Sequence, residues 1–284
     1  MAGAGPNIKA GHLGVATVLA LSLAACTAQP QAAHRVAPTA NPSPAATRTT
    51  TPRPLAALPA GVVAHGSRAL PLVALTFDSN LTPFMERELD RGTVRSFDNT
   101  AEIGELVRLR VPATFFLSGL WMQRYPGTTR QLGRVPFFEI GSHSYSHRGF
   151  APHCYELGLL PVGQRAADIV ASEAVLARYV RRPTRLFRFP GGCYDPASLR
   201  AARAAHVIVV QYDVASGDAF GQSVQGIVRH TLSSVRNGSI VVMHITGGNT
   251  APLSAAALPA VVRGLRSRGF QLVTVSRLLA GLRS

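Results

Sequence analysis

The chain has 284 residues, enough for one large domain or two small ones besides shorter segments. Hydrophobic residues make up 46%, charged residues only 15%, and the formal charge is +15. Lys9 is the only lysine, and the arginines are scattered with no run beyond Arg181-Arg182, so a nucleic-acid-binding protein is not indicated. Attraction to an anionic cell envelope explains the net positive charge better than nucleic-acid binding does. The plainest explanation of much of the arginine excess is a compositional bias toward Ala and Arg.

Residues 1–26 have the pattern of an export signal. A short basic start is followed by an apolar run over 13–25, which is too brief for a confident membrane span. The run ends Leu-Ala-Ala-Cys at Cys26 and resembles the lipobox of bacterial lipoproteins. A plain signal peptide with an incidental cysteine is the alternative. We expect a lipoprotein anchored to the outer face of the bacterial plasma membrane through lipid on Cys26.

Residues 27–60 are dominated by Ala, Pro and Thr and contain no acidic or aromatic residue. Such a segment cannot bury enough apolar surface to fold, and its prolines favour an extended spacer. We expect a disordered linker here. The two remaining cysteines, Cys154 and Cys193, can persist as a disulfide outside the cell, and two separate buried thiols are the alternative.

From residue 61 onward, short apolar runs alternate with helical patterns. Strands are predicted over 70–77, 113–117, 137–140, 185–189, 207–211, 239–243 and 271–275. Helices are predicted over 99–110, 120–132, 164–180, 196–205, 223–235 and 254–268. This alternation predicts an α/β domain over 61–284, a distorted (β/α) barrel of about seven parallel strands. Residues 79–98 fit no element and are expected to form a loop near the active face.

Polar side chains recur directly after the predicted strands. They are Asp78, His143, His147, Arg188, Asp213, Asp218 and His244. The carboxyl ends of parallel strands lie on one face of the fold, where active sites sit. We therefore expect these separate segments to converge on one site.

The spacing of four between His143 and His147 puts both imidazoles on one side of a helical turn. Two His with an oxygen ligand and an open position are typical of catalytic zinc. A His pair alone is better explained by a structural role, but the flanking serines and the position after a strand favour the metal site. Near such a metal, Asp78 can act as general base toward water. Arg188 is positioned to pair with Asp78.

Two further features suit hydrolysis of an acyl group. Gly191 and Gly192 let the backbone approach a ligand closely, so that an amide N–H there can stabilise an oxyanion; a simple turn is the alternative. His244 is a candidate general acid for the leaving amine, and a core histidine is its alternative.

Together these motifs resemble the polysaccharide deacetylases with a NodB-type domain, carbohydrate esterase family 4. The family motif Thr-Phe-Asp-Asp resembles residues 76–79, His-Ser/Thr-x-x-His matches 143–147, and Arg-x-Pro-x-Gly matches 188–192. The motifs Asp-x-x-Asp-Trp and Leu-x-His are approximated by 215–219 and 242–244. The resemblance covers about 71–279 and implies a NodB-like barrel.

The resemblance also implies roles for individual residues. The catalytic set is Asp78 as base, His244 as acid, Arg188 orienting the base and Asp218 tuning the acid. The metal ligands are His143, His147 and the Ser79 position. The substrate-binding set is Pro190, Gly191, Gly192 and Val242. The implied cofactor is a divalent metal, Zn²⁺ first, with Co²⁺ or Ni²⁺ as alternatives.

Three positions depart from the family pattern. Ser79 replaces a ligand Asp, and its neutral hydroxyl is a weaker ligand, so the amide of Asn80 or a water is an alternative oxygen. Ala219 and Gly191 replace a Trp and a Tyr, which indicates a roomier or rearranged pocket. The aromatic residues considered to fill it are Tyr194, Tyr212, Phe84 and Phe97.

The expected function is removal of N-acetyl groups from a polysaccharide, either peptidoglycan or another N-acetylglucosamine-containing glycan, by a monomer. Two alternatives stay open: a weakened homologue that binds wall glycan without turnover, and an O-deacetylase. A glycosidase would need two carboxylates at a set separation and would leave the His pair idle.

Overall fold

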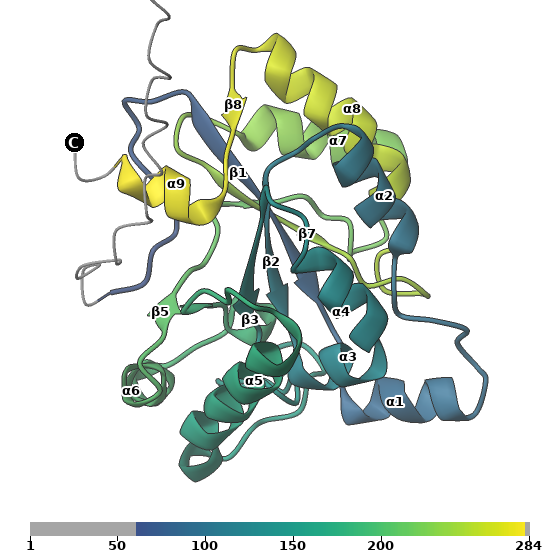
Figure 1. The fold of residues 1–284 in the computed structure, drawn as a ribbon, viewed down its shortest axis with the longest axis vertical. Coiled ribbons are helices and arrows are strands. Elements are labelled where there is room, and N and C mark those ends of the chain that lie inside the picture. Colours follow the sequence, from purple (N-terminus) through teal and green to yellow (C-terminus); the bar gives the residue numbers. More distant parts are fainter. Residues whose placement is uncertain (1–60, 282–284) are drawn as a thin grey trace, which may run out of the picture. The chain divides into compact units, whose positions relative to one another are not determined.

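The computed structural model describes residues 61–281 (Figure 1). The predicted signal, the linker and Cys26 lie outside the described residues. Within residues 61–281, no helix has both the length and the hydropathy that a membrane span requires.

The strands of the described part form one parallel sheet in the order β5-β4-β3-β2-β1-β7-β6, with β8 pairing β1 outside this path. They are β1 Leu72–Ser79, β2 Ala113–Leu117, β3 Phe138–Ser142, β4 Leu186–Phe187, β5 Ile208–Val209, β6 Val214–Ala215, β7 Ile240–His244 and β8 Gln271–Leu272. Isolated bridges join Val63 to Val210, just after β5, and His65 to Ser239, just before β7. The predicted distorted (β/α) barrel of parallel strands is confirmed.

Helices connect the strands and cover the outside of the sheet (Figure 1). The α-helices are α1 Pro83–Asp90, α2 Thr100–Arg108, α3 Gly119–Arg124, α4 Pro126–Leu132, α5 Arg165–Tyr179, α6 Pro196–Ala204, α7 Val224–Ser234, α8 Ser254–Ser267 and α9 Val275–Ala280. Two 3₁₀ turns, η1 Val162–Gln164 and η2 Pro190–Gly192, lie before α5 and after β4.

The prediction of a loop over 79–98 is wrong, because α1 lies within it. Thr82 caps this helix by accepting a hydrogen bond from the Met85 N–H, and Pro83 takes the first position, where its missing N–H costs nothing. Phe97 at the end of the segment is fully buried in the core, and its carbonyl accepts from the Trp121 indole N–H. The segment is therefore part of the packed fold.

Other helices and strands begin or end at residues that differ from the predicted ones, for reasons found in the local sequence. The helix predicted over 120–132 is two helices, because Pro126 cannot continue α3 and Tyr125 before it leaves the helical region at φ −121° and ψ 59°. The strands predicted over 185–189, 207–211 and 271–275 each shorten to two residues, and Val275 begins the unpredicted α9. The short β6 was also not predicted.

Successive side chains of β1 point to opposite faces of the sheet and pack into two different hydrophobic clusters. Leu75 and Phe77 belong to the cluster that packs against the outer helices. Ala74 belongs to a second cluster with Ile240 of β7 and Leu278 of α9. Phe116 of β2 also belongs to this cluster, whereas the later positions of β1 on the same face as Ala74 are the polar Thr76 and Asp78.

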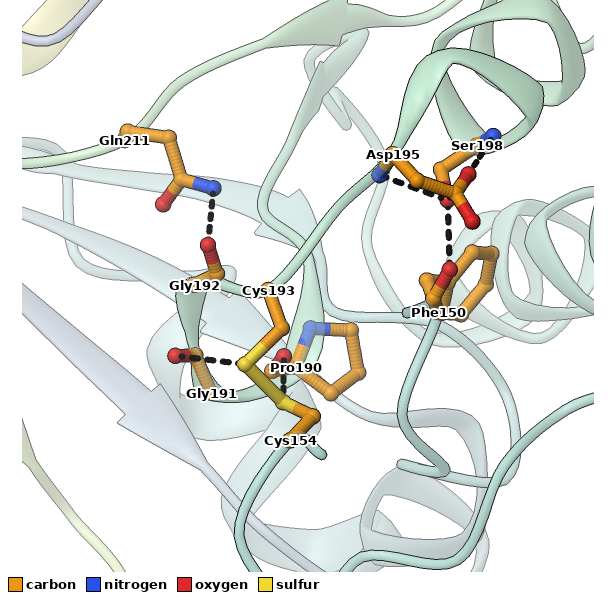
Figure 2. Close-up of a disulfide and its surroundings, with 9 residues drawn as sticks. All are labelled: Phe150, Cys154, Pro190, Gly191, Gly192, Cys193, Asp195, Ser198 and Gln211. Atoms are coloured by element: carbon orange, nitrogen blue, oxygen red, sulfur yellow. Dashed lines mark hydrogen bonds between the residues drawn. A yellow bond between two sulfur atoms is a disulfide. The ribbon is translucent and has the colours of Figure 1, made fainter. Parts of the chain in front are cut away.

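The predicted disulfide between Cys154 and Cys193 is confirmed (Figure 2). The two Cα atoms are 5.8 Å apart and the bond closes a loop of 39 residues. It joins the segment after β3 to the end of η2, two segments at the carboxyl end of the sheet.

Helix α2 carries a buried carboxyl group close to that end. The Asn99 side chain caps the helix by accepting from the Glu102 N–H, and the Asn99 N–H donates to the Ile245 carbonyl just after β7. Glu102 is completely buried. Burial first, and then the negative charge of Asp218, raise the pKa of Glu102 well above 4.5. The fold therefore favours the protonated form of Glu102.

This gives a prediction for Glu102→Gln. A carboxyl whose folded pKa is raised contributes its full stability below about pH 4.5 and loses it as pH rises toward the folded value, at up to roughly 1.4 kcal/mol per pH unit. The neutral amide of Gln does not titrate, so its contribution to stability stays constant between pH 4 and pH 8. The melting temperature of the variant minus that of the wild type should therefore increase from pH 4 to pH 8, measured by thermal unfolding. Glu105→Gln, on the same helix, is the control: this partly exposed carboxylate pairs with Arg108 and its pKa is lowered, so its difference should not increase over the same window. An equal difference at every pH in Glu102→Gln would contradict the account.

Candidate active site

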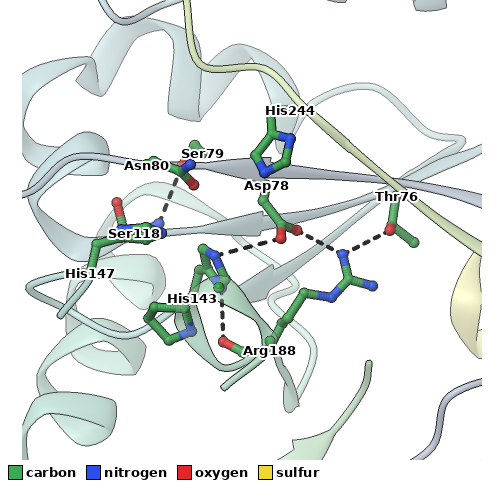
Figure 3. Close-up of polar contacts among 12 residues, drawn as sticks. Thr76, Asp78, Ser79, Asn80, Ser118, His143, His147, Arg188 and His244 are labelled. Atoms are coloured by element: carbon green, nitrogen blue, oxygen red, sulfur yellow. Dashed lines mark hydrogen bonds and ion pairs between the residues drawn. The ribbon is translucent and has the colours of Figure 1, made fainter. Parts of the chain in front are cut away.

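The base of the site is an ion pair inside the barrel (Figure 3). Arg188 has no exposed surface, and Asp78 at the end of β1 is 4% exposed. One guanidinium nitrogen of Arg188 donates to Asp78 Oδ1 at 2.7 Å and to Thr76 Oγ1 at 2.8 Å. The other guanidine nitrogens donate to the carbonyls of Val210 and Gln211. Arg188 is therefore held by side chain and backbone together, and it fixes the orientation of the Asp78 carboxylate.

His143 lies on the other side of Asp78. Its Nδ1–H donates to the Arg188 carbonyl at 2.8 Å, which leaves the Nε2 lone pair facing Asp78 Oδ2 at 3.5 Å. Burial lowers the pKa of His143, and the nearby Asp78 carboxylate only partly opposes this. A neutral imidazole therefore presents a free lone pair toward a carboxylate oxygen.

The second imidazole, His147, lies against the first, with the ring centroids 4.9 Å apart. Neither ring nitrogen of His147 has a hydrogen-bond partner among the described residues, although both are buried. Burial, and then the neighbouring His143 and His244, lower the pKa of His147 well below 6.5. This ring is also held neutral with an unused lone pair.

The predicted helical turn carrying the two histidines is wrong. Ser144 and His147 have φ values of 65° and 52°, which a right-handed helix does not allow. The segment is instead a loop in which Ser144 Oγ accepts from the His147 N–H. The Asp168 carboxylate of α5 accepts from the Tyr145 and Ser146 N–H groups at 2.7 Å and 3.3 Å. This loop, not helical spacing, brings the imidazoles together.

A second carboxylate–histidine pair lies at the end of β7. Asp218 Oδ1 accepts from His244 Nδ1 at 2.9 Å, and Asp218 Oδ2 accepts from the His244 N–H and from Ser254 Oγ. Burial lowers the pKa of His244, but the charge and hydrogen bond of Asp218 outweigh it, so that the pKa is raised overall. The geometry thus leaves Nε2 of His244 as the atom free for chemistry.

These groups surround one cavity of about 220 Å³. Most of the predicted site residues line it, namely Asp78, His143, His147, Gly191, Gly192, Asp218, Val242 and His244. Arg188 and Pro190 are buried behind the lining. Ser79 is also fully buried, and its Oγ accepts from the Ser118 N–H at 3.2 Å. The Gly192 N–H donates to the Phe189 carbonyl, so the predicted oxyanion role falls to the Gly191 amide.

The donor set around the cavity bears on metal binding. Within residues 61–281, no three His, Cys, Asp or Glu side chains are arranged to hold an ion. However, the buried Oδ1 of Asn80 lacks a hydrogen-bond partner in the described part, as do both His147 nitrogens. Two neutral imidazoles and an unsatisfied amide oxygen facing one cavity fit a divalent cation. The ligand roles of Ser79 and Asn80 both stay predictions.

Two expectations about the surroundings are wrong. Asp213 does not join the site, because the unpredicted β6 separates it from Asp218; it pairs with Arg68 at 2.8 Å and accepts from the Ile240 N–H at the amino end of β7. Of the aromatic residues considered to fill the pocket, only Tyr212 lines it. Phe84 is exposed, Phe97 lies in the core and Tyr194 stacks on Phe189.

The motif analysis missed two aromatic residues at the cavity, Tyr155 and Phe220. Both lie in irregular segments, and neither belongs to a motif. The only sequence signal was their proximity to Cys154 and Asp218, since a disulfide partner and a site residue each place their neighbours near the site.

Proteins named as deacetylases are similar to this chain in sequence. The chain is 28% identical over 211 residues to a peptidoglycan-N-acetylglucosamine deacetylase of Bacillus cereus, covering 73% of this chain and 88% of that protein. It is 25% identical over 217 residues to a chitooligosaccharide deacetylase of Sinorhizobium fredii, covering 73% of this chain and 92% of that protein.

Solved structures share the fold. A peptidoglycan N-acetylglucosamine deacetylase in complex with an N-hydroxybenzamide ligand matches with a TM-score of 0.65 at 24% identity, covering 77% of this chain and 92% of that chain. A carbohydrate esterase family 4 pseudoenzyme of Bacillus anthracis matches with a TM-score of 0.62 at 20% identity, covering 79% of this chain and 70% of that chain. The sequence pattern of the polysaccharide deacetylase family matches residues 66–210, and the chain belongs to this family.

Proposed function

We propose that this protein is a metal-dependent N-deacetylase of peptidoglycan or another N-acetylglucosamine-containing polysaccharide. The observation that carries the proposal is the arrangement of two carboxylates around one cavity. Asp78 is held by Arg188, and Asp218 is held by His244. One pair is suited to accept a proton and the other to deliver one, as amide hydrolysis requires. Relatives named for acting on peptidoglycan and chitooligosaccharides support the substrate class.

Asp78 is the general base. Arg188 binds Oδ1, so Oδ2 is the oxygen that faces the cavity and His143. The arrangement restricts the carboxylate to one orientation, which lowers the entropic cost of aligning it with an attacking water. A proton taken from that water passes to Oδ2.

His244 is the general acid. Its Nδ1 is occupied by Asp218, and a protonated ring therefore presents Nε2–H to the cavity. The Asp218 carboxylate favours the protonated ring, which is the form that can donate to the departing amine. The Gly191 amide at the cavity wall is placed to donate to the carbonyl oxygen as charge develops there.

His143, His147 and the amide oxygen of Asn80 would hold the metal, with Ser79 as the alternative oxygen ligand. A divalent cation, most simply Zn²⁺, would act there as a Lewis acid on the acetyl carbonyl and make water acidic enough to deprotonate near neutral pH. This assignment is supported by the buried ring nitrogens of His147 and the buried Oδ1 of Asn80, which have no hydrogen-bond partner in the described part of the chain.

A second candidate function is glycan binding without turnover. It is favoured by the absence of a third carboxylate or imidazole ligand in the described residues, and by Ser79 at the family's ligand position. A pseudoenzyme is also among the structures that share the fold. The intact Asp78–Arg188 and Asp218–His244 pairs favour the enzyme.

The sequence pattern of residues 1–26 supports a proposal for where the protein acts. We propose that the protein is exported and held by lipid on Cys26 at the outer face of the plasma membrane, acting as a monomer on wall glycan with residues 27–60 as a spacer. The net charge of +15 suits an anionic envelope.

The enzyme proposal predicts zinc-dependent acetate release. Purified protein with Zn²⁺ should release acetate from peptidoglycan or chitooligosaccharides, and Asp78→Asn should lower kcat by roughly 10²–10⁴-fold because the base is lost. The substitution also leaves Arg188 without its counter-charge, so the assay temperature must lie below the melting point of the variant. Asp90→Asn, on the exposed face of α1, is the matched control. Saturable glycan binding with no acetate from any N-acetylated glycan would favour the binding protein instead.

The Asp218–His244 pair predicts a shift in the pH–rate profile. Because His244 acts in its protonated form, the rate falls as pH rises through its pKa. Asp218→Asn removes the charge that raises this pKa, so the alkaline limb of kcat should move to lower pH. Ser254→Ala removes a hydrogen bond to Asp218 but keeps the charge and should move the limb less. An alkaline limb that stays in place in Asp218→Asn would rule out His244 as the acid.

A further inference from the structure

Two large aromatic side chains lie exposed at the rim of the active-site cavity. Tyr155 is 62% exposed and Phe220 is 61% exposed, yet both line the cavity. Their ring centroids are 5.8 Å apart with an angle of 41° between the planes. They come from distant parts of the chain, one after β3 and the other after β6. Neither belongs to the packed core, so their exposure requires another explanation.

Tyr155 is held in place by its neighbours. The adjacent Cys154 is bonded to Cys193 beyond η2 (Figure 2). Tyr155 and His153, on either side of Cys154, have φ values of 48° and 58°, a region that bulky side chains rarely adopt. Such a conformation persists only where the surrounding structure imposes it, and strained segments of this kind gather at ligand sites.

The position of the Tyr155 ring depends on a glycine. A Cβ added at Gly191 would lie 2.8 Å from Cys154 Sγ and 3.0 Å from Tyr155 Cδ2. Gly191 also has φ 63°, which favours glycine. The Tyr155 ring therefore occupies the space beside the cavity that any side chain at position 191 would take. The small Ala219, which directly precedes Phe220, also lines the cavity.

We propose that Tyr155 and Phe220 form a sugar-binding subsite at the cavity mouth, positioned by the Cys154–Cys193 disulfide. The inference rests on the proposed function, because it assigns the glycan substrate to this surface. A pyranose ring carries a face of C–H groups that packs on aromatic rings as other apolar surface does, while its hydroxyls stay in water. The pair would hold a sugar ring next to the residue being deacetylated and so favour polymers over single sugars.

The subsite predicts a selective loss of substrate affinity. Losing one aromatic contact should raise KM for N-acetylchitotetraose roughly tenfold, with kcat within about twofold, because the rings do not touch the reacting atoms. Tyr155→Ala and Phe220→Ala are the test variants, assayed by acetate release and by calorimetric binding of the tetramer. Tyr155→Phe keeps the aromatic ring, so its KM should stay at the wild-type value. Phe84→Ala, about equally exposed but absent from the cavity lining, should change nothing.

The disulfide is tested with the double variant Cys154→Ser/Cys193→Ser. It should raise KM for the tetramer as Tyr155→Ala does, and adding Tyr155→Ala to it should raise KM little further, because both act through the same ring. Unchanged KM and unchanged tetramer binding in both alanine variants would overturn the subsite. Tetramer binding that is lost in Tyr155→Ala would support it even where the wild type releases no acetate, so that failure of the enzyme proposal stays distinguishable. A wild type that does not bind the tetramer would overturn the subsite directly.

Discussion

A charged guanidinium without any exposed surface lies inside the barrel, and the site is organised around it. Burying such a charge is costly unless it is paired and its donors are satisfied. Arg188 meets this requirement with Asp78, Thr76 and two backbone carbonyls, and its Cζ lies 4.1 Å from the centroid of the Phe116 ring. Its own carbonyl accepts from His143. One buried residue thereby fixes both the carboxylate and the first imidazole.

The different roles that we propose for the Asp78 and Asp218 carboxylates follow from their ion-pair and hydrogen-bond partners. Asp78 faces a permanent cation and a neutral imidazole, and it keeps an oxygen toward the cavity. Asp218 is fully engaged by His244 and Ser254 and presents no free oxygen for a base role. In the mechanism we propose, these two chemically identical side chains take opposite roles, acceptor of a proton and supporter of a donor, because of what surrounds them.

The sequence alone was sufficient to predict features that depend on repeating patterns or on short-range motifs. Alternating apolar strands and helices predicted the parallel barrel, and the positions of Asp78, His143, Arg188 and His244 after strands predicted their convergence. It was insufficient where tertiary contacts decide. Positive φ angles at Ser144 and His147 made a loop of an expected helical turn, and the two-residue β6 separated Asp213 from the site. Tyr155 carried no periodic signal because a disulfide and a glycine position it.

The remaining chemical question is the oxygen ligand opposite the two imidazoles. The Ser79 hydroxyl accepts from the Ser118 N–H, whereas the Asn80 amide oxygen borders the cavity and has no hydrogen-bond partner among residues 61–281. Anomalous diffraction at the zinc edge, from crystals of the protein grown with Zn²⁺, tests this most directly. The account predicts one strong peak in the cavity within ligand distance of His143, His147 and Asn80 Oδ1. Crystals of active protein without a peak at these residues would contradict it.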